Sequence, residues 1–235
     1  MKSWVIGDIH GCARTLQALV ENHIIPSSND HIYFIGDYID RGPSSRQTID
    51  YIWQLASNGI QIHALQGNHE EMLVNAYDSA YREKKKWFTR KNSHLDSWLM
   101  VGGKDTLNSF NTNQVSQIPD SYISWMRNLS LYAETTNFLI VHAGFNFKES
   151  FIFEDKKSMK WIRNFEVDMK KTHGKRVIHG HVPVPAEVII NCVNSDQYPF
   201  IAIDNGCVYK GRNGMGALAA VEINSMQLCF QPNVD

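Results

Sequence analysis

Carboxylate and imidazole side chains recur at the ends of apolar runs in this sequence. In the first case, Asp8 and His10 stand two residues apart at the end of a strand-like stretch that begins at Val5. Because side chains alternate along an extended backbone, Asp8 and His10 can point the same way. A carboxylate and an imidazole on the same side of a strand are typical of half of a metal site.

The same arrangement returns at four later points, each directly after an apolar run: Asp37, Asn68 with His69, His142 and His181. In open α/β proteins, ligand sites lie outside the carboxyl ends of the strands, so these ends can converge on one crevice. The side chains offer oxygen and imidazole donors without thiolate, which suits Mn²⁺, Zn²⁺ or Fe.

Phosphoryl transfer is the chemistry that such a site performs. Asp37 can bridge two ions, and two ions about 3.5 to 4 Å apart clamp both the attacking and the leaving oxygen of a displacement at phosphorus. The ions also bring the pKa of a bound water to roughly 7, which supplies hydroxide at neutral pH. The sequence therefore predicts two divalent ions, with Mn²⁺ as the first choice, and no protein nucleophile.

Two arginines are candidates for binding the substrate phosphate. Arg41 follows Asp40 within a turn-like stretch, and its planar guanidinium can bind phosphoryl oxygens bidentately. Arg163 lies between His142 and His181 in the sequence, where a loop can pass over the site. A surface ion pair is the alternative for Arg163.

Histidine supplies the predicted proton donor. His69 directly follows Asn68, so it is better placed to protonate the leaving oxygen than to share a metal with Asn68, and Asp40 can hold it in the protonated form. His179 is a candidate for orienting a ligand. The other histidines have no motif around them, and we expect structural or surface roles for them: His23, His31, His63, His94 and His173.

The elements that must position these residues form an α/β pattern. Strand, helix, strand units fill residues 5–65, with helices over 13–22 and from Ser44 or Ser45 onward. Later strands are expected at 138, 176, 186 and 200, and a final hairpin joins 217–223 to 226–231 through a two-residue turn at Asn224 and Ser225. This order favours two stacked mixed sheets with flanking helices in a single domain, 1–235.

A mainly helical, cap-like segment is expected at about 70–135. Within it, the run 84–86 of three lysines is interpreted as a solvated helix face, and contact with an anionic substrate is the alternative. The stretch 102–106 lacks the full spacing of a phosphate loop and is interpreted as a helix junction in a cap over the site.

Composition narrows the range of partners. The 235 residues are 43% hydrophobic, and 23 basic residues against 24 acidic ones give a formal charge of −1, so we expect no extended nucleic-acid surface and no membrane binding. The four widely spaced cysteines are expected to be reduced thiols. With no signal peptide and no apolar run of about 18 residues, a cytoplasmic location is expected.

The motifs resemble those of the phosphoprotein phosphatase family of calcineurin-like metallophosphoesterases, in its compact bacterial and bacteriophage lambda form. The resemblance extends from residue 5 to about 223. Three segments match the signature motifs and two more match later metal-binding histidines: 7–11, 36–42, 67–70, 141–144 and 180–181. The resemblance implies a four-layer αββα sandwich and frequent dependence on Mn²⁺.

The resemblance also implies a role for each matching residue. One metal is held by Asp8, His10 and Asp37, and the other by Asp37, Asn68, His142 and His181. The substrate phosphate meets Arg41, Asn68 and Arg163, and the acid pair is His69 with Asp40. The segment 203–209 departs from the phosphatase pattern and is similar to bacterial relatives that include symmetrical dinucleoside polyphosphate hydrolases.

Three functions follow from these observations. The first is a phosphomonoesterase that hydrolyses phosphoserine or phosphothreonine, in proteins or small phosphate esters, by direct attack of a metal-bridging hydroxide; Glu70 favours it, since dinucleotide hydrolases often carry Asp at that position. The second is a symmetrical dinucleoside polyphosphate hydrolase, such as a diadenosine tetraphosphatase, which requires an adenine pocket. The third, a non-catalytic phosphate-binding scaffold, is disfavoured because every site position is filled.

Overall fold

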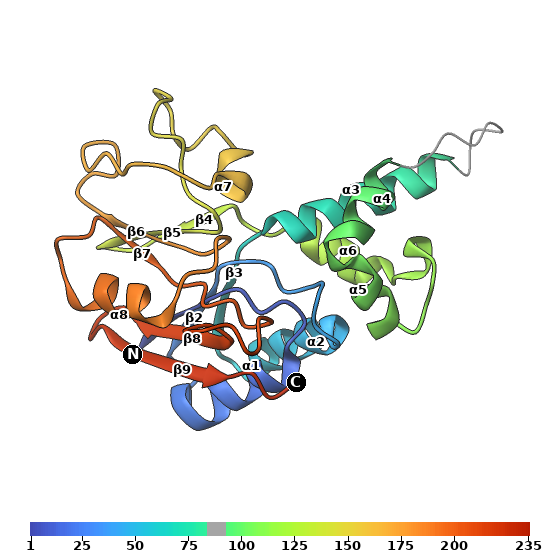
Figure 1. The fold of residues 1–235 in the computed structure, drawn as a ribbon, viewed down its shortest axis with the longest axis horizontal. Helices are drawn as coiled ribbons and strands as arrows, with labels where there is room; N and C mark the ends of the chain where they lie inside the picture. Colours follow the sequence, from blue (N-terminus) through green and yellow to red (C-terminus); the bar gives the residue numbers. More distant parts are fainter. Residues whose placement is uncertain (84–92) are drawn as a thin grey trace.

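The computed structural model describes residues 1–83 and 93–235, and its frame is a pair of mixed β-sheets (Figure 1). The five-stranded sheet has the order β3 (Gln61–Ala64), β2 (His31–Phe34), β1 (Ser3–Ile6), β8 (Ala217–Glu222) and β9 (Gln227–Pro232). Strands β1, β2 and β3 are parallel to one another. Strand β8 is antiparallel to its neighbour β1, and β9 is antiparallel to β8. The carboxyl ends of β1, β2 and β3 therefore meet at one edge of the sheet.

The four-stranded sheet has the order β4 (Tyr132–Glu134), β5 (Phe138–Val141), β6 (Arg176–His179) and β7 (Phe200–Ala202). Strands β5, β6 and β7 are parallel, and β4 pairs with β5 in the antiparallel sense. The prediction of two mixed sheets flanked by helices is confirmed. The short strand β4 lies at the end of the mainly helical segment 70–135 and belongs to this sheet.

The helices divide into three groups along the chain. The first lies between the strands of the first half: α1 (Ala13–Leu19) with the π-helical turn η1 (Val20–Ile24), and α2 (Ser45–Ser57). The cap-like segment contains α3 (Asn68–Glu83), α4 (Ser93–Trp98), η2 (Leu99–Gly103), α5 (Lys104–Ser109), η3 (Val115–Gln117) and α6 (Asp120–Arg127), and the second half adds α7 (Ser158–Trp161) and α8 (Ala186–Asn194). In Figure 1, α3 to α6 project to one side of the sheets.

The alternation of strand side chains separates the hydrophobic core into layers. Trp4 and Ile6 of β1 face the helices α1 and α2, whereas Val5 faces the second sheet. The core beneath α1 and α2 continues into the cap-like segment, which contributes Leu73 and Trp98 to it. The cap-like helices thus share a core with the first sheet.

The outer face of the second sheet is covered differently. The side chains of Leu139 and Val177 on this face pack against Phe145 and Met159, which lie in a long segment that holds only the four-residue helix α7. This fourth layer is therefore thin, because aromatic side chains of a loop bury the sheet face in place of a long helix.

One predicted strand is a helix. The β-branched run from 186 was expected to be extended, but it forms α8. Along it, Ile189, Cys192 and Val193 are buried at helical spacing, whereas Val188 and Ile190 are each 39% exposed. Burial on one helical face in the core between the sheets has overridden the local β-propensity.

The final hairpin also differs from the expectation. The last pair joins Glu222 to Gln227, so four residues form the turn and not two. The Glu222 carboxylate accepts hydrogen bonds from the backbone N–H groups of Asn224 and Ser225 and from the Ser225 hydroxyl. These bonds stabilise the wider turn.

The lysine run 84–86 lies outside the described residues. Among the residues that the structure describes, no helix has the length and apolar character needed to cross a membrane.

Candidate active site

The predicted site residues lie on short turns at the strand ends. His10, Asp37 and His181 have positive φ angles of 48°, 52° and 68°, and Asp40 and Arg41 have φ of 72° and 71°. Non-glycine residues rarely occupy this left-handed region, and they concentrate at functional sites where the fold holds them. The turns redirect the chain so that side chains from separate strands face a common centre.

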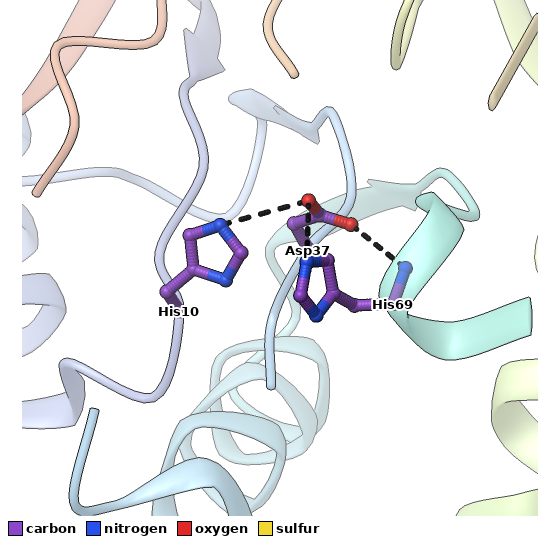
Figure 2. Close-up of side chains that lie close together, drawn as sticks. All are labelled: His10, Asp37 and His69. Atoms are coloured by element: carbon purple, nitrogen blue, oxygen red, sulfur yellow. Dashed lines mark hydrogen bonds and ion pairs between the residues drawn. The ribbon is translucent and has the colours of Figure 1, made fainter. Parts of the chain in front are cut away.

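Asp37 lies at that centre (Figure 2). Its Oδ2 lies 3.6 Å from His10 Nε2 and 3.9 Å from His69 Nε2, and its Oδ1 accepts a 3.1 Å hydrogen bond from the His69 backbone N–H. On the other side, Oδ1 lies 3.5 Å from His142 Nε2. Burial opposes ionisation of Asp37, but His142, His69 and His10 outweigh it and lower the pKa of the carboxyl.

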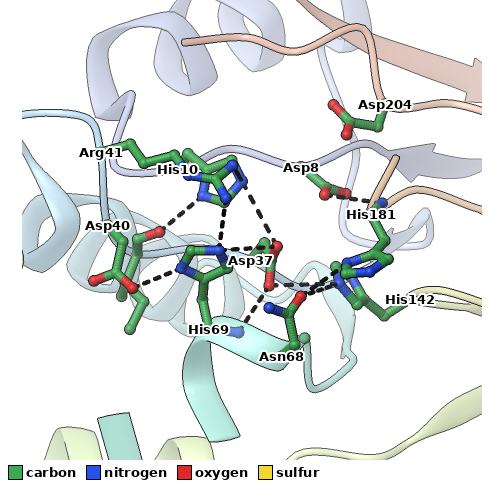
Figure 3. A network of polar contacts seen from close by, with 12 residues as sticks. Asp8, His10, Asp37, Asp40, Arg41, Asn68, His69, His142, His181 and Asp204 are labelled. Carbon is green, nitrogen blue, oxygen red and sulfur yellow. Dashed lines mark hydrogen bonds and ion pairs between the residues drawn. The ribbon is translucent and has the colours of Figure 1, made fainter. Parts of the chain in front are cut away.

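Two groups of ligand-type atoms share this carboxylate. The atoms offered by His10, Asp37 and His69 all lie within 4.8 Å of one another, and so do those of Asp37, His142 and His181. Asn68 belongs with the second group, because its Oδ1 lies 3.0 Å from His142 Nε2 and 2.9 Å from His181 Nδ1 (Figure 3). The neighbours Asn68 and His69 thus point to different groups.

Backbone carbonyls fix the orientation of two of these histidines. His10 Nδ1 lies 3.0 Å from the Ile39 carbonyl, and His142 Nδ1 lies 3.0 Å from that of Ile35. Donation from Nδ1 leaves a lone pair on Nε2, the ring nitrogen that lies near Asp37 in both histidines. Burial lowers the pKa of both histidines, so the imidazoles are neutral and suited to bind a metal.

Asp8 stands outside the two groups and faces a carboxylate that the sequence reasoning missed. Its Oδ2 accepts a 3.0 Å hydrogen bond from the His181 backbone N–H, and Asp204 lies nearby (Figure 3). Burial, Asp204 and Asp37 raise the pKa of Asp8, and burial raises the pKa of Asp204 to about 7. The signal that marks the other site residues is present here too, because Asp204 directly follows the apolar run 200–203.

Arg41 lies between the two histidines on one side of the site. Its two terminal nitrogens donate to His10 Nε2 at 2.7 Å and to His69 Nε2 at 2.9 Å. His69 Nδ1 in turn lies 2.7 Å from Asp40 Oδ2. Burial opposes protonation of His69, but Asp37 and Asp40 outweigh it and raise its pKa.

The cap-like segment holds Asp40 in place. Trp98 Nε1 donates to its carboxylate at 3.0 Å, and Thr106 Oγ1 donates to Oδ1 at 2.6 Å. Gly102, with φ of 114°, lies so close to Arg41 that an added Cβ would come within 2.7 Å of the Arg41 backbone nitrogen. The stretch 102–106, predicted as a helix junction, therefore contacts the acid pair directly.

Glu70 has a structural role. Its buried carboxylate accepts hydrogen bonds from the backbone N–H groups of Gly67, Asp37 and Tyr38, at 3.0, 2.9 and 2.8 Å. These three bonds join the end of β3 to the turn that carries Asp37. Glu70 thus gives no support to the choice of a phosphoprotein substrate.

Arg163 lies apart from the hydrogen-bonded cluster, in an exposed position after α7. It is close enough to His181 to oppose protonation of that imidazole, whose pKa burial and His142 lower to about 3. The segment is fastened to α3, because Trp161 Nε1 donates to Glu71 Oε2 at 2.6 Å and Lys160 pairs with the same carboxylate.

His179 does not orient any of the predicted ligands. Its Nδ1 lies 3.2 Å from the Gly180 carbonyl, and its ring packs against Phe165 and Phe200 on the outer face of the second sheet. The hypothesis that His179 supports a metal ligand was therefore wrong. His181 has a positive φ, so the extended chain ends before it and the side chains of His179 and His181 do not share one side of a strand.

The donor set fits divalent metal ions. Among the described residues, buried polar side-chain atoms without a partner include Asp8 Oδ1 and His181 Nε2, and both belong to this site. Buried polar atoms are normally paired, so these two atoms indicate a missing ligand. Carboxylate, amide and neutral imidazole donors suit a hard or borderline divalent ion.

Comparison with known proteins agrees with the fold and the site. Residues 1–185 match the family model described as calcineurin-like phosphoesterase. The chain therefore belongs to the calcineurin-like phosphoesterase family. The finer resemblance to the phosphoprotein phosphatases is not established by this match.

Two similar proteins found by sequence carry the same name. A symmetrical bis(5'-nucleosyl)-tetraphosphatase from Pseudomonas fluorescens is 27% identical over 148 residues, and one from Photorhabdus laumondii is 30% identical over 146. Each match covers 61% of this chain, but only 42% and 44% of the respective relative.

Solved structures share the fold at low identity. A candidate diadenosine tetraphosphatase superimposes with a TM-score of 0.60 at 16% identity, covering 100% of this chain and 94% of its own. A protein serine/threonine phosphatase from Saccharomyces cerevisiae gives 0.66 at 14%, covering 100% of this chain and 81% of its own. At such identities the likeness concerns the fold alone.

Proposed function

We propose that this protein hydrolyses dinucleoside tetraphosphates symmetrically, with two divalent metal ions. Phosphoester hydrolysis with two ions is supported by one observation: two groups of ligand-type atoms share the carboxylate of Asp37. The names of the sequence relatives support the substrate class. These names favour a dinucleoside polyphosphate substrate over a phosphoserine or phosphothreonine substrate. Glu70 no longer supports the phosphoprotein substrate, because its carboxylate has a structural role.

The metal-binding roles follow the predicted sets. We assign one ion to Asp8, His10 and Asp37, and the other to Asp37, Asn68, His142 and His181. When bound, such ions polarise phosphoryl oxygens and lower the pKa of water, and Mn²⁺ is the first ion to test.

The other side chains bind the substrate and move a proton. Arg41 exchanges its contacts with His10 and His69 for phosphoryl oxygens of the tetraphosphate, and Arg163 binds further along the phosphate chain. Water attacks a central phosphorus, and the bond from that phosphorus to the central bridging oxygen breaks. His69 donates its proton to this oxygen while Asp40 holds the ring, so two nucleoside diphosphates leave.

The test compares substrates under one set of conditions. We expect the Mn²⁺-loaded protein to show a kcat/KM for diadenosine tetraphosphate at least 100-fold above that for a phosphothreonine peptide, a difference of roughly 2.7 kcal/mol in transition-state binding. Chromatography should show ADP as the sole product. A preference for the peptide, or AMP with ATP as products, would refute the proposal.

A variant distinguishes hydrolysis by this site from hydrolysis by a contaminating enzyme. Asp37→Asn removes the charge that both groups share, and we expect hydrolysis of every substrate, including an aryl phosphate, to fall by at least about 100-fold. Unchanged hydrolysis of the aryl phosphate by Asp37→Asn would exclude this site as the catalytic centre.

A further inference from the structure

A large cavity lies on the outer side of the second sheet, next to the candidate active site. It has a volume of about 1120 Å³ and is enclosed by the segment 146–168, strands β6 and β7, and the start of α8. The cavity lies where the fourth layer is a loop and not a long helix. At about 1120 Å³ the cavity slightly exceeds the roughly 300 to 1,000 Å³ of typical small-molecule sites, so it has room for an organic ligand.

Aromatic rings form one wall of this cavity. The ring of Phe165 lies 5.0 Å from that of His179, 6.1 Å from Phe147 and 6.5 Å from Phe200, measured between centroids. The Phe165 ring packs directly on Gly144, where an added Cβ would lie 2.3 Å from Cε1. Phe165 is therefore fixed by the same strand end that carries His142.

The cavity borders residues that adjoin the candidate active site. Arg163 lines it, and so does Val182, which directly follows His181. Arg163 thus faces an apolar cavity on one side and lies near a predicted metal ligand on the other. This is the arrangement expected for a ligand with an apolar ring at one end and a phosphate chain at the other.

A second cavity with aromatic walls is the competing candidate. It has a volume of about 790 Å³ and is lined by Tyr33, Trp53, His63 and Trp125, between β3 and α6. None of its described lining residues belongs to the predicted site, and no arginine lines it. A base bound there would have no phosphate-binding group beside it.

We propose that the cavity beside Arg163 is the subsite for one nucleobase of the substrate, which deepens the function proposed above and rests on it. The base packs against the Phe165 ring, and the phosphate chain passes Arg163 on its way to the centre. Stacking on an aromatic side chain tolerates every base, so the subsite favours nucleosides in general and adenosine is one case. No described residue of the cap-like segment 70–135 lines this cavity, because its lining residues lie between 146 and 202.

The kinetic test removes the aromatic face and retains an apolar side chain. In Phe165→Leu we expect the KM for diadenosine tetraphosphate to rise at least about tenfold, while the KM for inorganic tripolyphosphate, which has no base, stays within about twofold. Phe165→Tyr retains the ring and should restore the low KM. Phe153→Leu is the matched control, since Phe153 packs in the same aromatic cluster but does not line the cavity.

A second test measures occupancy without catalysis. Val188 and Ile190 are equally exposed on α8, but only Val188 lines the cavity. In Val188→Cys, we expect ADP with Mn²⁺ to slow alkylation of the introduced thiol at least about fivefold, whereas pyrophosphate, which has no base, has no effect. In Ile190→Cys, ADP should leave the alkylation rate unchanged.

The outcomes distinguish this inference from the proposed function. Hydrolysis of diadenosine tetraphosphate with an unchanged KM in Phe165→Leu would overturn the subsite and leave the function intact. Protection of Val188→Cys by ADP in a protein that does not hydrolyse dinucleotides would overturn the function and support the subsite. Equal protection by ADP and pyrophosphate would show phosphate binding alone and overturn the subsite.

Discussion

Thr106 Oγ1 donates a 2.6 Å hydrogen bond to Asp40 Oδ1, although 66 residues separate the two in the chain. Trp98 donates to the same carboxylate, so the cap-like segment supplies two of the donors that orient the acid pair. Both donors are buried, and a buried carboxylate needs such partners to remain ionised beside His69. The cap-like segment therefore takes part in the site as well as covering it.

Removing the Thr106 hydroxyl should weaken catalysis. In Thr106→Val we expect kcat to fall about tenfold with little change in KM, because a hydrogen bond to a charged group contributes about 1.5 to 3 kcal/mol. Steady-state kinetics on diadenosine tetraphosphate measures the effect. Thr48→Val is the control, since Thr48 is also buried but bonds only to a helix carbonyl. Equal losses of kcat in both variants would contradict a specific role for Thr106.

Glu71 should act through the position of Arg163. In Glu71→Ala, helix α7 loses the bonds of Lys160 and Trp161 to α3 and can no longer hold the residue Arg163 that follows it. We therefore expect the KM for the tetraphosphate substrate to rise by about three- to tenfold, with a smaller change in kcat. Asp78→Asn is the control on the same helix, because it removes only an exposed ion pair with Arg127. An unchanged KM in Glu71→Ala would show that the segment is held by other contacts.

Gly67 should not tolerate a side chain. An added Cβ would lie 2.1 Å from Asp37 Oδ1 and 2.5 Å from its backbone nitrogen, so Gly67→Ala must displace the shared carboxylate. We expect loss of bound metal, measured by elemental analysis, together with loss of activity. Gly211→Ala is the control: its φ of 79° costs about 1 kcal/mol, but nothing lies within 4 Å of the new methyl group. Full metal content in Gly67→Ala would contradict the expected clash.

Asp155 should contribute stability that depends on pH. Hydrogen bonds from the Ser158 hydroxyl and backbone N–H, with a further one from Asn146, lower the pKa of Asp155 below its usual value. A lowered folded-state pKa stabilises the protein above the unfolded pKa of about 4, and the contribution is lost as the pH falls through the folded-state value.

The corresponding measurement is the Tm of Asp155→Asn and of the natural protein between about pH 3 and pH 7. We expect the natural protein to have the higher Tm near neutral pH, and the difference to shrink as the pH falls below about 4. A difference in Tm that grows toward low pH would contradict the sign of the shift.

Much of the fold was predictable because the strand pattern is local. Apolar runs that end in glycine, aspartate or histidine identified β1, β2, β3, β5 and β6 without any knowledge of their neighbours. The helix at 186–194 was not predictable, because its β-branched residues favour a strand until the core between the sheets selects one helical face. The width of the turn after Glu222 was not predictable either, because it depends on hydrogen bonds to the Glu222 carboxylate that no turn motif predicts.

The sequence by itself determined which side chains would meet at the centre. Asp8, His10, Asp37 and Asn68 follow the ends of β1, β2 and β3, and the ends of parallel strands lie at one edge of a sheet, so local order is sufficient to bring these four together. His142 follows β5 of the other sheet, so its approach depends on how the two sheets pack. Only the tertiary structure decided what surrounds them. Thr106 and the ring of Phe165 come from distant segments, and their placement depends on how the cap-like helices and the loop over the second sheet pack, which no local pattern encodes.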